Sequence, residues 1–258
     1  MSRGLEILFL GTGTSQGVPV IACPCLVCKS KHVHDIRLRS SILVRSENTS
    51  VVIDTGPDFR QQMLIHNITK LDAVVFTHEH KDHIAGLDDI RAYNYVQQKN
   101  MPVYCTRLVE TAIRRDFFYA FSESKYPGVP EMDIIPIDEK NSFQIGDIPF
   151  VPIRVFHHRL PVLGFRIYGF VYITDANSIP DDELEKLKGA RIVVLNALRK
   201  QSHISHFNLE QALSIMEYIK PEYGYFTHIS HLMGLHNEVE AELPSHIRLA
   251  YDGMKLAI

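Results

Sequence analysis

Short hydrophobic runs along the chain predict a series of β-strands. These runs are rich in β-branched and aromatic residues, and nearly all of them end in a polar residue that could carry chemistry. We expect strands at 6–10, 41–45, 50–54, 73–77, 102–105, 150–156, 170–174, 192–196 and 223–227. The pattern therefore indicates a protein built around β-sheet, with candidate functional residues at the strand ends.

The segments between the strands contain helical signals. After Asn208 the apolar residues follow a helical period, Asn208 and Gln211 form a capping box, and Pro221 marks the end. A second helix is expected over 180–188, because it opens with Pro and acidic residues and stops at Gly189. No repeat or linker interrupts this order, so we expect a single α/β domain over 1–258, with a cap-like segment near 97–139.

Composition places the chain among ordinary globular proteins. Of its 258 residues 45% are hydrophobic and 22% are charged, which excludes disordered, collagenous and coiled-coil classes. The net charge of -3 gives no support for a nucleic-acid partner. No signal peptide and no apolar run of ~18 residues is evident, so we expect a cytoplasmic protein without a membrane partner.

Histidine is unusually frequent, with 14 residues, as many as glycine. Imidazole is the commonest metal ligand and the usual proton carrier near neutral pH. The densest cluster of potential ligands lies in 77–83, directly after the strand at 73–76. Side chains at i and i+2 of an extended loop point the same way, so His78 and His80 can bind one ion while Asp82 and His83 turn towards a second.

Three of the four cysteines also form a cluster. Cys23, Cys25 and Cys28 lie too close together in the sequence for a disulfide framework. Such a group is typical of thiolate metal ligands in a reducing compartment, which predicts a zinc-binding loop near 17–32. Cys105 stands alone in a predicted strand and is interpreted as a small buried hydrophobic residue.

Residues 78–83 match the signature His-x-His-x-Asp-His, and the chain therefore resembles the metallo-β-lactamase superfamily. The resemblance implies an αββα sandwich of two mixed β-sheets flanked by helices, with the site at one edge and Asp54 supporting the metal loop. It implies that the ligands are His78, His80 and His157 for one metal, Asp82, His83 and His228 for the other, and Asp175 as a bridge. His158 is the alternative to His157 as a ligand. We favour His157 because of its spacing from Gly164.

The glycine-rich stretch 11–17, followed by the cysteine cluster, narrows the resemblance to the branch containing the phosphonate-pathway cyclic phosphodiesterase. That branch implies one structural zinc held by Cys23, Cys25, Cys28 and His231. A closed four-ligand site of this kind leaves no position for substrate. His206, which precedes the capped helix, is implied to bind substrate or donate a proton, so Asp82 and His206 are the candidate catalytic residues. Arg37 and Arg39 could also contact phosphate, but an exposed loop is the favoured location for both.

These observations predict a metal-dependent hydrolase, specifically a phosphodiesterase acting on a small or cyclic phosphodiester. Two divalent ions, Zn or Mn, would activate the attacking water. One alternative is a tRNA 3′-processing endonuclease, which the net charge and the lack of a Gly- and Lys-rich arm disfavour. Another is a non-catalytic metal-dependent sensor or binding module, whose sequence sign would be a lost ligand. The expected partner is a small molecule, and a homodimer is compatible with the sequence.

Overall fold

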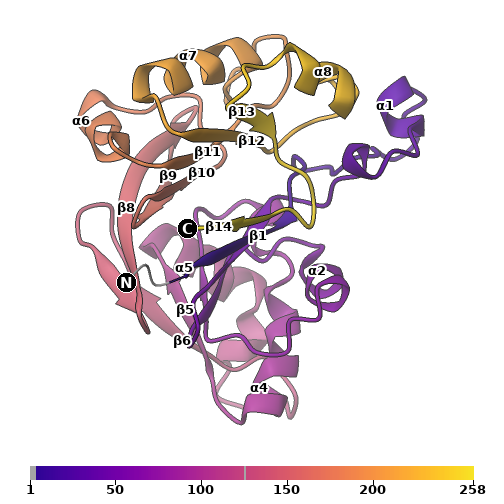
Figure 1. Cartoon of the computed structure of the whole chain (residues 1–258). Helices are drawn as coiled ribbons and strands as arrows, with labels where there is room; N and C mark the ends of the chain where they lie inside the picture. Colours follow the sequence, from indigo (N-terminus) through magenta and orange to yellow (C-terminus); the bar gives the residue numbers. More distant parts are fainter. Residues whose placement is uncertain (1–3, 125) are drawn as a thin grey trace.

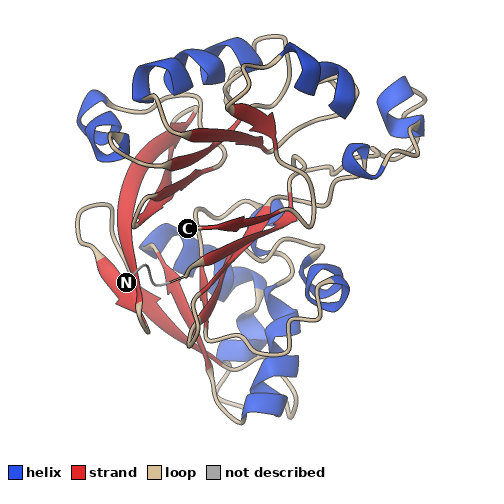
Figure 2. Cartoon of the chain, in the orientation of Figure 1, coloured by secondary structure: helices blue, strands red, loops and turns tan. Residues whose placement is uncertain are grey.

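Two β-sheets stacked face to face form the centre of the protein (Figure 1). The structure is a computed structural model that describes residues 4–124 and 126–258. Helices cover the outer faces of both sheets, as Figure 2 shows by colour. The layers are therefore helix, sheet, sheet and helix, and the fold expected from the sequence is confirmed.

Each sheet has seven strands in the described part of the chain. In spatial order the first contains β14 (Lys255–Ala257), β1 (Glu6–Gly11), β2 (Ser41–Arg45), β3 (Ser50–Ile53), β4 (Ala73–Val75), β5 (Met101–Cys105) and β6 (Met132–Pro136). The second contains β13 (Ile247–Leu249), β12 (Tyr223–Thr227), β11 (Ile192–Asn196), β10 (Phe170–Ile173), β9 (Leu160–Ile167), β8 (Ile148–His157) and β7 (Phe143–Ile145).

Both sheets are mixed, and their parallel halves position the functional residues. Strands β3 to β6 run parallel, as do β10 to β13, whereas the remaining neighbours are antiparallel. Ile53 lies opposite Val75, and Leu195 lies opposite both Ile173 and Phe226. The residues that follow these strands consequently leave the two sheets at their carboxyl ends.

The helices are short, apart from two. They are α1 (Leu26–Lys29), α2 (Phe59–Ile65), α3 (Lys81–Ile84), α4 (Arg91–Gln97), α5 (Arg107–Asp116), α6 (Asp181–Leu184), α7 (Leu209–Ile219) and α8 (His236–Glu242). Single 3-10 turns occupy Val33–Asp35, Leu87–Ile90, Phe118–Phe121 and Glu185–Leu187. The capping box predicted for α7 is present, because Asn208 and Gln211 bond each other's backbone N–H groups.

Alternation along the strands divides the hydrophobic core into three layers. In β1, Leu8 and Leu10 point to the cluster under the outer helices, whereas Ile7 and Phe9 point between the sheets. A third cluster lies between the second sheet and α7. Successive side chains of a strand point to opposite faces of the sheet. A strand that is apolar on both faces therefore has to be packed against other elements on both faces.

The expected strands are all present, with ends shifted by up to two residues. Two other expectations differ from the structure. The segment 180–188 forms α6 and a separate 3-10 turn instead of one helix. The segment 97–139 is not a separate cap, because it contributes β5 and β6 to the first sheet and carries α5. None of the helices in the described part of the chain combines the length and apolar character needed to cross a bilayer.

Candidate metal centre

Three residues that line the candidate site leave their strands through an unusual backbone turn. Asp54 after β3, Asp175 after β10 and His228 after β12 have φ angles of 66°, 55° and 56°. A left-handed conformation is uncommon for residues other than glycine and costs roughly 1–3 kcal/mol each. All three side chains are buried. The fold therefore maintains a strained conformation where each strand delivers a polar side chain to the same edge.

The loop after β4 carries the histidine motif and packs tightly on its neighbours. A Cβ on Gly56 would overlap the carbonyl oxygen of Asp82, and one on Gly86 would overlap the carbonyl oxygen of Gly56. The backbone N–H of Thr55 also donates to the carbonyl of His83 at 2.8 Å. Glycine is required at these two positions because the backbones approach too closely for any side chain.

Four potential ligands converge at the centre of the site. Asp82, His83, Asp175 and His228 each offer an atom within 4.8 Å of those of the others. The Nε2 atom of His83 lies 3.2 Å from both Asp82 Oδ2 and Asp175 Oδ2, and His228 Nδ1 lies 3.1 Å from Asp175 Oδ2. Ligands held at ~2.1 Å around one ion lie roughly 3 Å apart, so this group has the dimensions of a metal site.

The electrostatics of this group also suit a cation. Burial alone would lower the pKa of His83, but the carboxylates of Asp175, Asp82 and Asp54 outweigh it and raise that pKa well above the ordinary value. Burial would raise the pKa of Asp175, yet His228 and His83 hold it well below its usual range. The site thus concentrates negative charge on carboxylates, and this charge must be balanced by positive charge. A divalent ion would provide that positive charge.

A second compact group shares one residue with the first. Ligand atoms of His157, Asp175 and His206 also lie within 4.8 Å of one another. The rings of His78 and His80 stand beside it, with centroids 4.6 Å apart and that of His80 5.0 Å from His157. Asp175 belongs to both groups, the place that the family resemblance gives to a bridging ligand. His206, expected at the substrate, lies directly among the ligand candidates.

Burial strongly affects His206. Its side chain is 10% exposed, and Nδ1 lies 3.9 Å from Asp175 Oδ1. Burial lowers the pKa of His206 to about 3, with a further contribution from His228. The imidazole is therefore neutral in the free protein at neutral pH even with Asp175 nearby, and it needs a further anionic partner before it can hold a proton.

Buried atoms without partners test whether this site fits metal ions. Asp54 contacts His83 Nδ1 at 2.8 Å, and Thr77 Oγ1 contacts His78 Nδ1 at 2.9 Å. The opposite nitrogen of His78, Nε2, is buried and has no hydrogen-bond partner among the described residues. Nε2 of His83 likewise makes no hydrogen bond there, and its polar neighbours are the carboxylate oxygens of Asp82 and Asp175. Unsatisfied buried polar atoms are rare, and metal-ligating histidines use one nitrogen for the ion and the other for a supporting group. The donor set fits divalent metal ions.

The structure distinguishes His157 from its neighbour. His157 Nδ1 contacts the carbonyl of Ser205 at 2.6 Å, which requires the ring to donate there and leaves Nε2 as the acceptor. His158 is exposed, and its backbone N–H donates to Asn177. Of the two, His157 lies beside His80 and His206 at the site.

The cysteine cluster forms a separate group with one histidine. The sulfurs of Cys23, Cys25 and Cys28 lie 3.3, 3.4 and 3.5 Å from Nδ1 of His231. A tetrahedral zinc with bonds of ~2.3 Å to sulfur and ~2.0 Å to nitrogen would separate these atoms by roughly 3.5 Å. A backbone N–H from Cys28, followed by His231, lowers the pKa of Cys25 to about 6. Geometry and ligand type therefore both fit zinc.

The two arginines considered for phosphate binding have other partners. Arg37 is buried and donates to Thr12 Oγ1 at 2.8 Å, to His236 Nδ1 at 3.0 Å and to the carbonyl of Ala250. Arg39 pairs with Asp58 at 3.0 Å. Arg37 thus joins the glycine-rich stretch 11–17, through Thr12, to the C-terminal segment, so the structure contradicts a phosphate contact for this residue.

A pH prediction follows from this buried arginine. Burial, followed by the charge of Arg37, lowers the pKa of His236 to about 4. The unfolded chain takes up this proton near pH 6.5, so the stabilisation is present above that pH and is lost as pH falls towards 4. The variant His236→Gln keeps an acceptor without titrating, and its unfolding free energy in urea should depend less on pH across this window. An unchanged slope would contradict the assignment.

Several supporting residues at the site were not predicted from the sequence. Thr14 Oγ1 lies 3.2 Å from His228 Nε2, while Ser40 Oγ and Thr174 Oγ1 lie 3.2 and 3.4 Å from its Nδ1. Thr14 belongs to the glycine-rich stretch 11–17, which therefore packs beside the site. A usable signal was the position of Thr174, which directly precedes a candidate ligand at a strand end.

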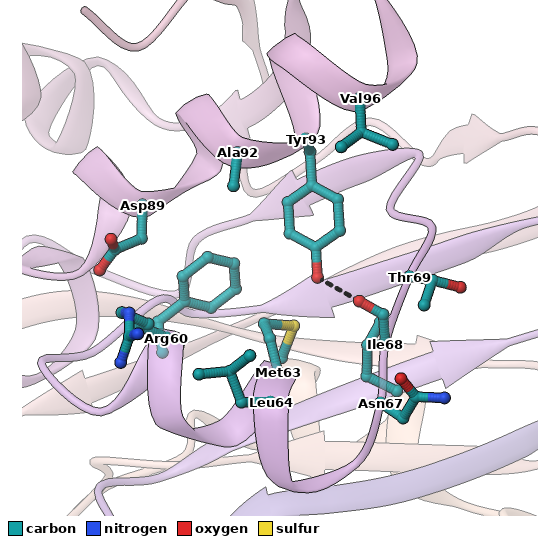
Figure 3. A pocket seen from close by; sticks show the side chains of 11 residues that line it. Arg60, Met63, Leu64, Asn67, Ile68, Thr69, Asp89, Ala92, Tyr93 and Val96 are labelled. Carbon is teal, nitrogen blue, oxygen red and sulfur yellow. Dashed lines mark hydrogen bonds between the residues drawn. The ribbon is translucent and has the colours of Figure 1, made fainter.

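An apolar pocket of about 380 Å³ lies elsewhere, between α2 and α4 (Figure 3). Phe59, Met63 and Tyr93 form part of its lining, and Arg60 and Asp89 lie at one end. The Tyr93 hydroxyl donates a hydrogen bond to the carbonyl of Ile68. No candidate metal ligand lines this pocket, which is therefore separate from the candidate metal centre at the strand ends.

Comparison with known proteins agrees with this architecture. The chain is 38% identical, with a TM-score of 0.92, to a structure described as a new diphosphatase from the PhnP family, covering 99% of our chain and 97% of that one. It matches the short form of human tRNase Z with a TM-score of 0.70 at 19% identity, covering 97% and 98% of the two chains. The latter likeness concerns the fold alone.

Sequence relatives have more varied names. The chain is 39% identical over 256 residues to an octanoyltransferase of Porphyromonas gingivalis, covering 98% of our chain and 52% of that protein. It is 25% identical over 168 residues to ribonuclease Z of Staphylococcus epidermidis, covering 63% and 49%. The chain thus spans about half the length of these relatives. Residues 49–229 match the model of the beta-lactamase superfamily domain. Together with the fold, this match shows that the chain belongs to the metallo-β-lactamase superfamily.

Proposed function

We propose that this protein is a metal-dependent phosphodiesterase acting on a small or cyclic phosphodiester. The observation that carries the proposal is the pair of ligand groups that share Asp175. Sites rich in carboxylate and imidazole suit divalent ions at phosphoryl groups, because such ions bind oxygen and nitrogen donors. The likeness to a diphosphatase of the PhnP family supports chemistry at phosphorus.

The residues of the two groups have distinct tasks in this proposal. His78, His80 and His157 would hold one divalent ion, Asp82, His83 and His228 the other, and Asp175 would contact both. Two divalent ions bound there would lower the pKa of an attacking water and would offset the negative charge on the phosphoryl oxygens. Asp54 orients His83, and Ser205 orients His157 through its carbonyl. The Cys23, Cys25, Cys28 and His231 group would hold one structural zinc.

His206 is the candidate proton donor to the leaving oxygen. It is neutral in the free protein, and a bound anionic phosphate would favour its protonated form. We expect His206→Ala to lower kcat for an alkyl phosphodiester by ~10²–10⁴-fold, the range of general acid catalysis. The loss should be much smaller for a nitrophenyl ester, whose leaving group needs no proton.

The matched control is His246→Ala, because this histidine is exposed and lies beside α7 and β13. It should retain the turnover of the unchanged protein with both esters. Equal losses for both leaving groups in His206→Ala would contradict proton donation and indicate that His206 only binds substrate or metal.

A second candidate reaction is cleavage of a phosphoric anhydride. The observation that favours it is the diphosphatase description of the protein at 38% identity. A diphosphate presents the same phosphoryl centre to the site, with phosphate instead of an alcohol as the leaving group. Both reactions need the same in-line attack on phosphorus.

Acyl transfer is the reaction named for the P. gingivalis relative, of which our chain matches 52%. Cys105, the one cysteine outside the zinc group, is 1% exposed, and burial raises its pKa to about 12. A thiol in this environment does not act as a nucleophile. We therefore propose hydrolysis at phosphorus for this chain.

A substrate panel tests the proposal. The protein loaded with Mn²⁺ or Zn²⁺ is incubated with bis(p-nitrophenyl) phosphate, a cyclic ribosyl phosphate, a nucleoside diphosphate and precursor tRNA. Nitrocefin is included to test for lactam hydrolysis, and every substrate is used with and without chelator. We expect chelator-sensitive cleavage of a small phosphoester or diphosphate. A fully loaded protein that leaves all phosphorus substrates intact would overturn the proposal, and cleavage of precursor tRNA alone would favour the nuclease.

The expected setting of this activity also belongs to the proposal. The substrate is a small molecule, and the net charge of -3 argues against a long nucleic acid. Free thiols at Cys23, Cys25 and Cys28 suit a reducing compartment, which supports a cytoplasmic location. We propose no membrane partner, and the mass of the protein in solution tests whether it forms a homodimer.

A further inference from the structure

Three threonines occupy equivalent places in the site. Thr77, Thr174 and Thr227 each follow or end a core strand, and each directly precedes a candidate ligand, namely His78, Asp175 and His228. All three side chains are buried. Their hydroxyl groups nevertheless have different partners, so their common position does not imply a common role.

The Thr77 hydroxyl connects two other groups. It donates to Asp54 Oδ2 at 2.8 Å and lies 2.9 Å from Nδ1 of His78. The backbone N–H of Thr77 donates to Asp54 Oδ1 at 2.8 Å, and its carbonyl accepts from the N–H of Leu163 at 3.1 Å. Each polar atom of Thr77 is therefore fixed by a partner.

Counting protons then determines the state of His78. A hydroxyl has a single hydrogen, and Thr77 gives that hydrogen to the carboxylate of Asp54. The short contact with His78 can be a hydrogen bond only if the ring Nδ1 carries a proton and donates it to Thr77. The neutral ring then has its lone pair on Nε2, the buried atom without a partner among the described residues.

Thr227 provides the contrast. It precedes His228 as Thr77 precedes His78, but its hydroxyl oxygen is buried without a hydrogen-bond partner in the described part of the chain. The hydroxyl of Thr174 donates to Asp175 Oδ2 at 2.6 Å and so supports its own neighbour directly. Thr174 also lies 3.4 Å from Nδ1 of His228, so it contacts two candidate ligands. Of the three, Thr77 is the one whose hydroxyl joins the histidine that follows it to Asp54, a carboxylate outside the candidate ligand set.

We propose that Thr77 is a positioning residue that couples the Asp54 carboxylate to His78 and sets the ring with Nε2 free for a metal ion. Asp54 then orients two imidazoles, His83 directly at 2.8 Å and His78 through the threonine hydroxyl. The effect on metal binding rests on the function proposed above, whereas the protonation pattern of His78 exists without metal.

The experiment compares Thr77→Val with Thr227→Val, two nearly isosteric changes that each remove one buried hydroxyl. Long-range ¹⁵N spectra identify the protonated nitrogen of His78 in proteins that carry no metal at the nitrogen and oxygen ligands. Titration with Mn²⁺, followed by the free Mn²⁺ signal, measures affinity at the nitrogen and oxygen ligands while the thiolate group keeps its zinc. Thr77→Ser restores the hydroxyl.

We expect protonation at Nδ1 of His78 in the unchanged protein, in Thr227→Val and in Thr77→Ser. Thr77→Val should lose this preference and bind the weaker of two Mn²⁺ ions 10–100-fold less tightly, the usual effect of removing a group that supports a ligand. Thr227→Val should change affinity by less than about twofold, since its hydroxyl supports no ligand. If valine prevents folding, Thr77→Ala provides the same comparison.

Two results would overturn the inference: protonation at Nε2 of His78 in the unchanged protein, or full affinity and an unchanged ring in Thr77→Val. Failure of the proposed function gives a different result. In that case the unchanged protein would show the Nδ1–H form of His78 and still bind no Mn²⁺ at these ligands, which supports the role of Thr77 in setting the ring and rejects the metal chemistry.

Discussion

Replacing Asp175 with Asn is expected to abolish phosphoester hydrolysis and to lower the bound metal below two ions per chain. The carboxylate belongs to both ligand groups, and its Oδ2 lies within 3.2 Å of nitrogens on His83 and His228. Asn keeps the size but removes the charge, so each ion loses attraction. A loss of roughly 4 kcal/mol in transition-state stabilisation corresponds to about a 10³-fold fall in rate.

Turnover of bis(p-nitrophenyl) phosphate and metal content measured on the same sample test this expectation. The control is Asp182→Asn, which removes one carboxylate from an exposed side chain on α6 and should leave both quantities unchanged. A variant at Asp175 that retains two ions and full turnover would exclude this residue as a ligand. Retained metal with lost turnover would instead place its role in substrate binding.

Local sequence patterns identified the strands but not where their ends turn. The strand predicted to run through Asp54 ends at Ile53, and that predicted through Thr174 ends at Ile173. In both places the next residues depart from the sheet, and Asp54 and Asp175 adopt positive φ. An amino-acid sequence does not show a left-handed turn at an aspartate, because tertiary contacts impose it.

The segment 97–139 was interpreted differently because of its polarity. Strand β6 lies at the sheet edge, and none of its residues is fully buried. A half-exposed edge strand lacks the continuous apolar pattern of strands such as β3. Its pairing with β5, with Val103 opposite Ile134, depends on a residue 31 positions away and cannot be deduced from local periodicity.

Long-range contacts account for the remaining differences. Arg37 and Ala250 are 213 positions apart, yet the guanidinium donates to that carbonyl. The grouping of His206 with His157 and Asp175 likewise depends on how the end of β8 and two loops meet. Residue types and strand-end positions thus indicated which side chains could carry chemistry. Which of them meet depends on the packing of the two sheets.

The group of Cys23, Cys25, Cys28 and His231, proposed to hold zinc, shows how such a long-range contact should affect the stability of the whole molecule. His231 lies 203 positions from Cys28, so a shared ion would act as a cross-link between the loop after β1 and the loop after β12. Loss of a covalent cross-link of this kind costs roughly 2–5 kcal/mol, and we take this range as a guide for zinc. For a chain of this size that corresponds to a fall in Tm of roughly 4–20 °C.

The variant Cys28→Ser should therefore lose zinc, unfold at a lower temperature and bind the active-site metal more weakly. The last effect follows because the same loop carries Thr14, whose hydroxyl lies 3.2 Å from the candidate ligand His228. Cys105→Ala is the matched control. It removes a buried thiol from the core cluster that contains Leu8 and Leu10, and it should keep one zinc per chain. Calorimetry measures Tm, metal analysis measures zinc content, and Mn²⁺ titration measures affinity at the candidate metal centre.

Full zinc content and an unchanged Tm in Cys28→Ser would contradict a zinc cross-link. Lost zinc with unchanged affinity for Mn²⁺ would show that the two sites are independent.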